Sequence, residues 1–131
     1  MEVTIADNQE VKYKEKIKRF YDYVKVCDGK QMCPVRDVFA PSVDKWSLFV
    51  IYNLAYNSDT RFNKLKKYIP NISSRMLSLT LKRLEESKIV SRKVFAEVPP
   101  RVEYKLTEFG YKFSKKLIDL NLWVMENLPE K

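Results

Sequence analysis

The spacing of the apolar residues changes near position 90, and this change limits the folds that the chain can adopt. From 73 to 87 the leucines recur at the spacing of a helix, which predicts an amphipathic helix with Ser73 as its N-cap. Over 90–97, and again over 102–106, apolar and polar residues alternate as they do in strands. Pro99 and Pro100 cannot lie inside a sheet, so they are expected at the tip of a hairpin that joins the two strands.

Two further helices are predicted before this unit. The segment from Trp46 to Tyr56 is almost continuously apolar, which favours a helix buried on most sides, with Asp44 as its N-cap. Residues 61–68 carry apolar side chains on one face and lysines elsewhere, which predicts a short helix. The turn that follows contains Asn71, a residue type that adopts the left-handed backbone more readily than most. The predicted fold class is therefore mainly α, with a small two-stranded antiparallel β hairpin.

The two ends of the chain are expected to differ in order. Residues 1–10 are polar and are predicted to form a flexible N-terminus, whereas residues 11–131 are predicted to form a single domain. Within that domain, apolar residues recur at helical spacing over 11–26, and the proline-containing stretch 31–44 is expected to be irregular. A last helix opens at Thr107 and carries an apolar stripe to its end.

The last helix has more apolar surface than one face of a domain needs. A second subunit is the simplest partner for such a surface. The alternative is that its aromatic residues Phe109, Phe113 and Trp123 line an effector pocket. The residues predicted to mediate dimerisation through the N- and C-terminal helices are Ile17, Phe20, Val24, Phe113, Leu117, Leu120, Trp123 and Val124.

The positive charge of the chain is concentrated in one segment. The formal net charge of the chain is +8. The segment from Arg61 to Lys105 holds twelve lysines and arginines against four glutamates, so its surplus of positive charge equals the net charge of the whole chain. A surplus of this size suits a polyanionic partner. A solvated basic face is the alternative, but it gives no reason for the charge to be so segregated.

Several classes of protein are excluded by the absence of histidine and the presence of only two cysteines. A structural zinc site needs about four Cys or His ligands, so no metal and no cofactor are expected. Histidine-based catalysis is excluded, and the missing CxxC pair argues against a thiol enzyme, so the chain is not expected to be an enzyme. The polar N-terminus is not a signal peptide and no apolar run is long enough to span a membrane, so a cytoplasmic protein without membrane contact is expected.

Six short motifs in a fixed order carry a family resemblance. They are Cys33-Pro34-Val35, Lys45-Trp46, Arg61-Phe62, the run Ile69 to Leu77 (IPNISSRML), the run Leu81 to Glu85 (LKRLE) and the run Pro99 to Thr107 (PPRVEYKLT). With them the chain resembles the HxlR-type winged helix-turn-helix regulators, which are related to the MarR group. The resemblance implies a homodimer, built from the N- and C-terminal helices, whose two recognition helices bind a two-fold site in double-stranded DNA. We expect the chain to regulate transcription as a repressor. The alternative function is a winged helix module used for protein–protein interaction, with its basic face docked on an acidic partner.

The predicted DNA contacts lie on the helix after Ser73, on the hairpin and on the short helix before the turn. Short and long polar side chains on one helix face suit entry into the major groove, where long ones reach base edges. Arg61 stands at a helix start, where a phosphate is stabilised. The residues predicted to contact DNA are Arg61, Ser73, Ser74, Arg75, Ser78, Lys82, Arg92, Lys93 and Arg101.

Cys33 is the candidate redox sensor, and the resemblance implies that role for the cysteine of the Cys-Pro pair. A sensing thiol must be accessible and must have a lowered pKa. Arg36 is near Cys33 in the sequence, and its positive charge could lower the pKa of the thiol. The alternative is that Cys33 is a small buried hydrophobic residue. Cys27 is a weaker candidate, as a resolving partner. The effector would then be an oxidant, an electrophile or another small molecule.

Overall fold

The computed structural model describes residues 5–25 and 33–129, and it divides the chain into two compact units, Met1–Asp37 and Val38–Lys131. The first unit contains helix α1 (Ile5–Lys25). A short π-helix, η1 (Pro34–Phe39), includes the boundary between the units. Within the described residues, no helix has the length and apolar character needed to cross a membrane.

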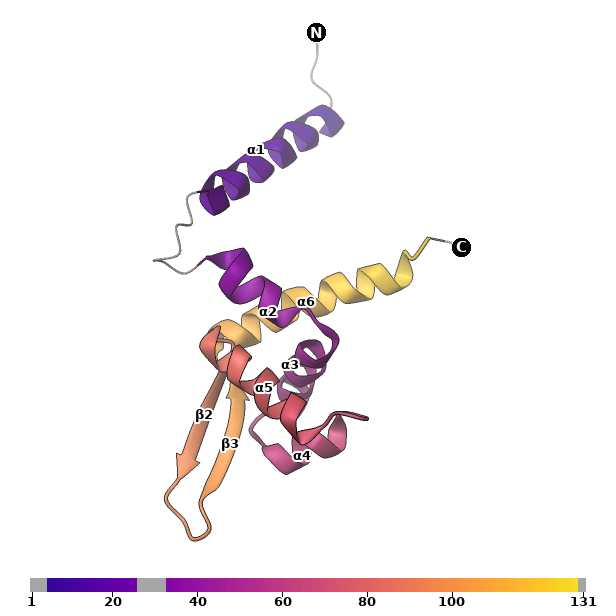
Figure 1. Cartoon of the computed structure of the whole chain (residues 1–131). Coiled ribbons are helices and arrows are strands. Elements are labelled where there is room, and N and C mark those ends of the chain that lie inside the picture. Colours follow the sequence, from indigo (N-terminus) through magenta and orange to yellow (C-terminus); the bar gives the residue numbers. More distant parts are fainter. Residues whose placement is uncertain (1–4, 26–32, 130–131) are drawn as a thin grey trace. The chain divides into compact units, whose positions relative to one another are not determined.

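The second unit contains the remaining helices and all the strands of the described chain (Figure 1). A helical turn and a longer helix come first, then a short strand and a pair of helices, and finally a hairpin and a long helix. In order, these are α2 (Ala40–Ser42), α3 (Lys45–Asn57), β1 (Thr60–Arg61), α4 (Phe62–Tyr68), α5 (Ser74–Glu86), β2 (Val90–Phe95), β3 (Arg101–Leu106) and α6 (Glu108–Glu126).

The sheet has three strands in the order β1-β3-β2, both pairs antiparallel. The predicted hairpin is confirmed as β2 and β3, with Val90 opposite Leu106 and Phe95 opposite Arg101. A third strand, in which Thr60 and Arg61 pair with β3, was not predicted from the sequence. Two residues are too few to show an alternating pattern, and their pairing depends on a partner strand far along the chain.

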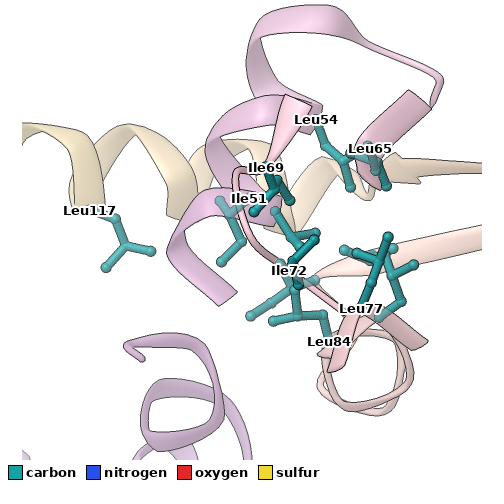
Figure 2. Packing of buried hydrophobic residues seen from close by; sticks show 12 residues of the cluster. Ile51, Leu54, Leu65, Ile69, Ile72, Leu77, Leu84 and Leu117 are labelled. Carbon is teal, nitrogen blue, oxygen red and sulfur yellow. The ribbon is translucent and has the colours of Figure 1, made fainter. Parts of the chain in front are cut away.

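The core of the second unit lies where α3 and α5 meet the start of β2 and the middle of α6 (Figure 2). The leucines predicted to form the core face of α5, Leu77, Leu81 and Leu84, are all buried. Burying one such side chain contributes about 1.5–3 kcal/mol. The whole cluster consists of Val50, Ile51, Leu54, Leu65, Ile69, Ile72, Leu77, Leu81, Leu84, Ile89, Val90 and Leu117.

Polar side chains fix the helix starts. The Asp44 carboxylate accepts a hydrogen bond from the Ser47 N–H (3.3 Å) at the start of α3, as predicted. The Ser73 Oγ accepts one from the Met76 N–H (3.0 Å) at the start of α5, also as predicted. Asn71 has φ 66°, so the left-handed conformation anticipated for the turn between α4 and α5 is confirmed.

The N-terminal region differs from the prediction in two respects. The helix predicted over 11–26 begins earlier, at Ile5, so that only residues 1–4 of the segment expected to be flexible lie outside the described part. The segment 31–44, expected to be irregular, contains η1 and α2. The prolines were interpreted as signs of irregular structure, but Pro41 stands at the start of α2, a position where proline is tolerated. The extent of a single domain over 11–131 stays a prediction.

Candidate nucleic-acid interface

Helix α5 presents a polar and basic face that no other described part of the second unit covers. Arg75, Ser78 and Lys82 are exposed and recur at helical spacing, so they lie within about 100° of arc on the helix. This face is opposite to the one formed by the buried leucines. Ser74 lies at its edge and is also exposed. An α-helix with its side chains is about 10–12 Å across, which suits a groove about 12 Å wide.

Ser73 differs from the other predicted contacts on α5. Its Oγ already accepts the Met76 N–H, so its hydroxyl is held at the N-cap. An N-cap serine typically contributes about 1 kcal/mol to stability. The capping role of Ser73 is therefore visible in the fold, whereas its predicted DNA contact stays a prediction.

The hairpin β2–β3 with its connecting residues 96–100, called the wing below, carries three exposed cations, Arg92, Lys93 and Lys105. Arg92 and Lys93 are both exposed, and the Lys93 Nζ lies 4.9 Å from the centroid of the Phe95 ring. The base of β2 packs against α5, so these cations and the basic face of α5 belong to one rigid unit. That Arg92 and Lys93 supply unspecific positive charge for DNA binding stays a prediction.

Arg101 lies in a different environment from Arg92 and Lys93. Its guanidinium lies 3.9 Å from the centroid of the Phe95 ring. It also pairs with Glu97 at 3.4 Å and with Glu103 at 3.5 Å, and its side chain is only 28% exposed. Exposed ion pairs of this kind contribute about 0–1 kcal/mol each, but together they fix the position of the side chain. The structure therefore gives Arg101 an organising role within the wing, and its predicted DNA contact stays a prediction.

Arg61 stands between the sheet and α4. It pairs with Glu103 in the register of β1 and β3, and its side chain is exposed. Together with Asn63 and the residues of the wing from 97 to 102, it lines an open concavity of about 410 Å³. A predicted phosphate contact is thus placed on the same side of the molecule as the tip of the wing.

Two exposed apolar residues of this surface were missed at the sequence level. Leu79 lies between Arg75 and Lys82 on the exposed face of α5 and is 39% exposed. Its position outside the stripe of Leu77, Leu81 and Leu84 was the signal that could have identified it. Val98, at the tip of the wing, is fully exposed. Apolar side chains in such places can contact thymine methyl groups or sugars.

The residues predicted to mediate dimerisation differ in how far they are buried within the single chain. Leu120, Trp123 and Val124 are exposed on the C-terminal half of α6, and Ile17 and Phe20 are exposed on α1. Val24 and Phe113 are partly buried, and Phe113 packs against the core. Leu117 is 4% exposed and belongs to the core of the second unit (Figure 2). Beyond Leu117, Leu122, Met125 and Leu128 are exposed as well, whereas at the start of α6 the exposed aromatic side chains are Phe109 and Tyr111.

The aromatic residues considered as the lining of an effector pocket, Phe109, Phe113 and Trp123, do not line the concavity between α3 and α6. An open concavity of about 490 Å³ lies between α3 and α6, and it is lined by Tyr52, Asn53, Ala55, Tyr56, Tyr111, Ser114, Lys115 and Ile118. Phe109 and Phe113 stack on each other with ring centroids 5.9 Å apart. Neither they nor Trp123 are among its lining residues.

Cys33 is buried, with 4% of its surface exposed. Its backbone N–H donates to the Asp37 carboxylate at 2.7 Å, and Arg36 donates to the same carboxylate at 2.7 Å. The hydrogen bonds from the Arg36 side chain and from the Cys33 backbone lower the pKa of Asp37 to about 2. The guanidinium expected to stabilise a thiolate is therefore paired with a carboxylate. This environment favours the packing alternative for Cys33, and its sensor role stays a prediction; Cys27 lies outside the described residues.

No group of three or more carboxylate, cysteine or histidine side chains that could hold a metal ion occurs among the residues that the structure describes.

The chain matches one family model and many named relatives. The model described as HxlR-like helix-turn-helix matches residues 43–131. The HTH-type transcriptional regulator YdeP of Bacillus subtilis is 36% identical over 96 residues, which cover 73% of this chain and 74% of YdeP. The HTH-type transcriptional regulator YtfH of Escherichia coli is 34% identical over 100 residues, which cover 76% of this chain and 79% of YtfH.

Solved structures show the same fold. Diamide-treated YodB from B. subtilis superposes with a TM-score of 0.65 at 31% identity, covering 76% of this chain and 99% of YodB. The redox regulator HypR in its oxidised form superposes with a TM-score of 0.62 at 36% identity, covering 75% of this chain and 100% of HypR.

Proposed function

Because this chain belongs to the HxlR-like helix-turn-helix family, we propose that it is a transcription regulator that binds double-stranded DNA sequence-specifically. Helix α5 enters the major groove, and α4 supports it from the side of the phosphate backbone. The wing lies over the neighbouring part of the duplex. Relatives named as HTH-type transcriptional regulators support this proposal.

The observation that carries the proposal is the exposed face of α5. This face holds exposed Arg75 and Lys82, and its acidic residues, Glu85 and Glu86, are confined to the last turn of the helix, so the N-terminal part of the face is basic. Arg92 and Lys93 extend the positive surface along the wing. A duplex carries one negative charge about every 1.7 Å of its axis, so a surface with this charge and shape is matched to it.

We also propose that the protein acts as a homodimer and a repressor. The exposed apolar side chains on the C-terminal half of α6 form the kind of continuous patch that a second subunit covers. A two-fold dimer places two copies of α5 on successive turns of the duplex. Such a dimer covers the DNA that a polymerase would need, which favours repression.

Salt dependence tests the DNA-binding proposal. Genomic fragments that the protein retains are sequenced, and the affinity for the shortest bound duplex is measured by fluorescence anisotropy at several salt concentrations. We expect the logarithm of the affinity to fall linearly with the logarithm of salt concentration. Lys82→Ala should make the slope shallower by about two, because the homodimer loses two cations, each of which neutralises one phosphate.

An acidic protein competitor serves as the control for that experiment. If the natural partner of the basic surface is an acidic protein and not DNA, a polyglutamate-rich protein will displace the labelled duplex. The competitor is added at the same concentration of negative charges as the duplex. Binding that does not change with salt, or that Lys82→Ala leaves unaltered in slope, would contradict the assigned phosphate contact.

Trp123→Glu tests the homodimer. The Trp123 side chain is 62% exposed in the single chain, so the substitution should leave the fold intact while placing a charge in the apolar patch. We expect the wild type to sediment at twice the mass of one 15.6 kDa chain, and the variant to need at least tenfold higher concentration to dimerise. Lys116→Gln, at an exposed position of the same helix, lowers the net charge by the same one unit and is the charge-matched control. A monomeric wild type would contradict the proposal.

A further inference from the structure

The start of α6 is tied directly to the end of α5. The Thr107 N–H donates to the Ile89 carbonyl (3.0 Å), and the Ile89 N–H donates to the Leu84 carbonyl of α5 (3.0 Å). The Thr107 Oγ1 donates to the Lys88 carbonyl (2.6 Å) and accepts a hydrogen bond from the Gly110 N–H (2.9 Å) in the first turn of α6. The hydroxyl of Thr107 therefore holds the beginning of α6 on the segment that leaves α5.

A second polar contact holds α6 against α3. The Asn121 Nδ2 donates to the Tyr52 hydroxyl on α3 (2.7 Å) and to the Leu117 carbonyl (2.7 Å). Between this contact and Thr107, Phe113 and Leu117 pack on the core. An open concavity of about 490 Å³ lies beside them between α3 and α6. Apolar packing thus holds the middle of α6, and a hydroxyl on each side of it fixes the direction of the helix.

Beyond the second contact, α6 continues to its exposed apolar patch. Trp123, Val124 and Met125 are exposed there, and this patch joins the subunits of the homodimer proposed above. Trp123 stands 16 residues after Thr107, a length of about 24 Å along a helix. A rotation of α6 by about 10° at Thr107 would move Trp123 by about 4 Å relative to α5. Neighbouring base pairs are about 3.4 Å apart, so a small rotation corresponds to a whole base pair.

We propose that the hydroxyls of Thr107 and Tyr52 set the half-site spacing that the homodimer accepts. This proposal rests on the proposed function. In a two-fold dimer the subunits meet at α6, so the direction of α6 relative to α5 determines how far apart the two copies of α5 lie. One added base pair moves a half-site by about 3.4 Å and turns it by about 34°. Thr107 and Tyr52 act through the placement of α5 and are positioning residues.

The test measures binding of the full chain to duplexes in which the spacer between the selected half-sites is one base pair longer or shorter. We expect the wild type to lose affinity at least about tenfold for either change, as much as for one mismatched base pair. Thr107→Val and Tyr52→Phe each remove one hydroxyl and keep the shape of the side chain. Each should reduce this discrimination to about threefold or less, because the lost hydrogen bond no longer resists rotation of α6.

Two control variants separate positioning from a loss of stability. Thr107→Ser keeps the hydroxyl and should retain the discrimination of the wild type. Asp44→Ala removes the N-cap of α3, a loss similar to that of the Thr107 cap, and it should also retain the discrimination. The affinity for a duplex with one half-site should stay within about twofold of the wild type in all four variants, because the face of α5 is unaltered.

The outcomes separate this proposal from the proposed function. A wild type that binds all three spacings equally would overturn the proposal and leave DNA binding intact. The same holds if Tyr52→Phe and a folded Thr107→Val discriminate as sharply as the wild type; if Thr107→Val does not fold, Tyr52→Phe alone decides. A monomeric wild type, or one that binds no duplex at low salt, would overturn both.

Discussion

Arg75→Ala will weaken binding to the selected duplex by about a thousandfold. One long side chain that contacts a base edge typically contributes about 1–3 kcal/mol, and a homodimer carries the substitution twice. The sum is about 4 kcal/mol, and each 1.4 kcal/mol changes affinity tenfold. Arg75 is exposed on the first turn of α5, the part of such a helix that contacts bases. Anisotropy titrations at one fixed salt concentration measure the change.

Arg75→Lys separates a base contact from a phosphate contact. Lysine keeps the positive charge but lacks the planar fork that binds guanine at two points. If Arg75 contacts a base, the lysine variant will lose preference for the selected sequence over a scrambled duplex, with little change in the salt slope. If Arg75→Ala and Arg75→Lys both prefer the selected duplex over the scrambled one as strongly as the wild type does, α5 lies differently on the DNA.

Gly110→Ala will destabilise the fold by about 3 kcal/mol. A Cβ at this position would lie 2.0 Å from the Ile89 carbonyl oxygen. That carbonyl accepts the Thr107 N–H (3.0 Å), and the Thr107 Oγ1 donates to the Lys88 carbonyl (2.6 Å). Because these backbone bonds join the start of α6 to the start of β2, neither segment can move away freely. We assign about 4 kcal/mol to the overlap, of which the better helix propensity of alanine returns up to about 1 kcal/mol.

Urea unfolding followed by circular dichroism measures this loss, and the melting temperature should fall by roughly 10 °C. Lys116→Ala, at an exposed position of the same helix, is the control and should change stability by no more than about 0.5 kcal/mol. A Gly110→Ala variant as stable as this control would contradict the close approach of α6 to Ile89.

Local patterns were sufficient to predict most of the helices and the hairpin. The apolar spacing of α5, the alternation of β2 and β3 and the side-chain caps at Asp44 and Ser73 are properties of neighbouring residues, so the sequence displays them directly. The left-handed turn at Asn71 belongs to the same class, since few residue types adopt that conformation at low cost.

Features that depend on distant partners could not be predicted. The strand β1 exists only because Thr60 and Arg61 meet β3. The pairing of Arg101 with Glu97 and Glu103 depends on the register of the hairpin. Leu117 belongs to the stripe expected at a subunit interface, yet the approach of α6 to α3 places it in the core.

The central claim is that α5 and the wing form the DNA-binding surface, and amide chemical-shift mapping tests it most directly. The ¹⁵N-labelled protein is titrated with the selected duplex and its backbone amide signals are followed. The account predicts the largest shifts at residues 74–83 of α5 and 92–100 of the wing, with small shifts at 120–126 of α6. Shifts that are confined to α6, with α5 and the wing unchanged, would contradict it.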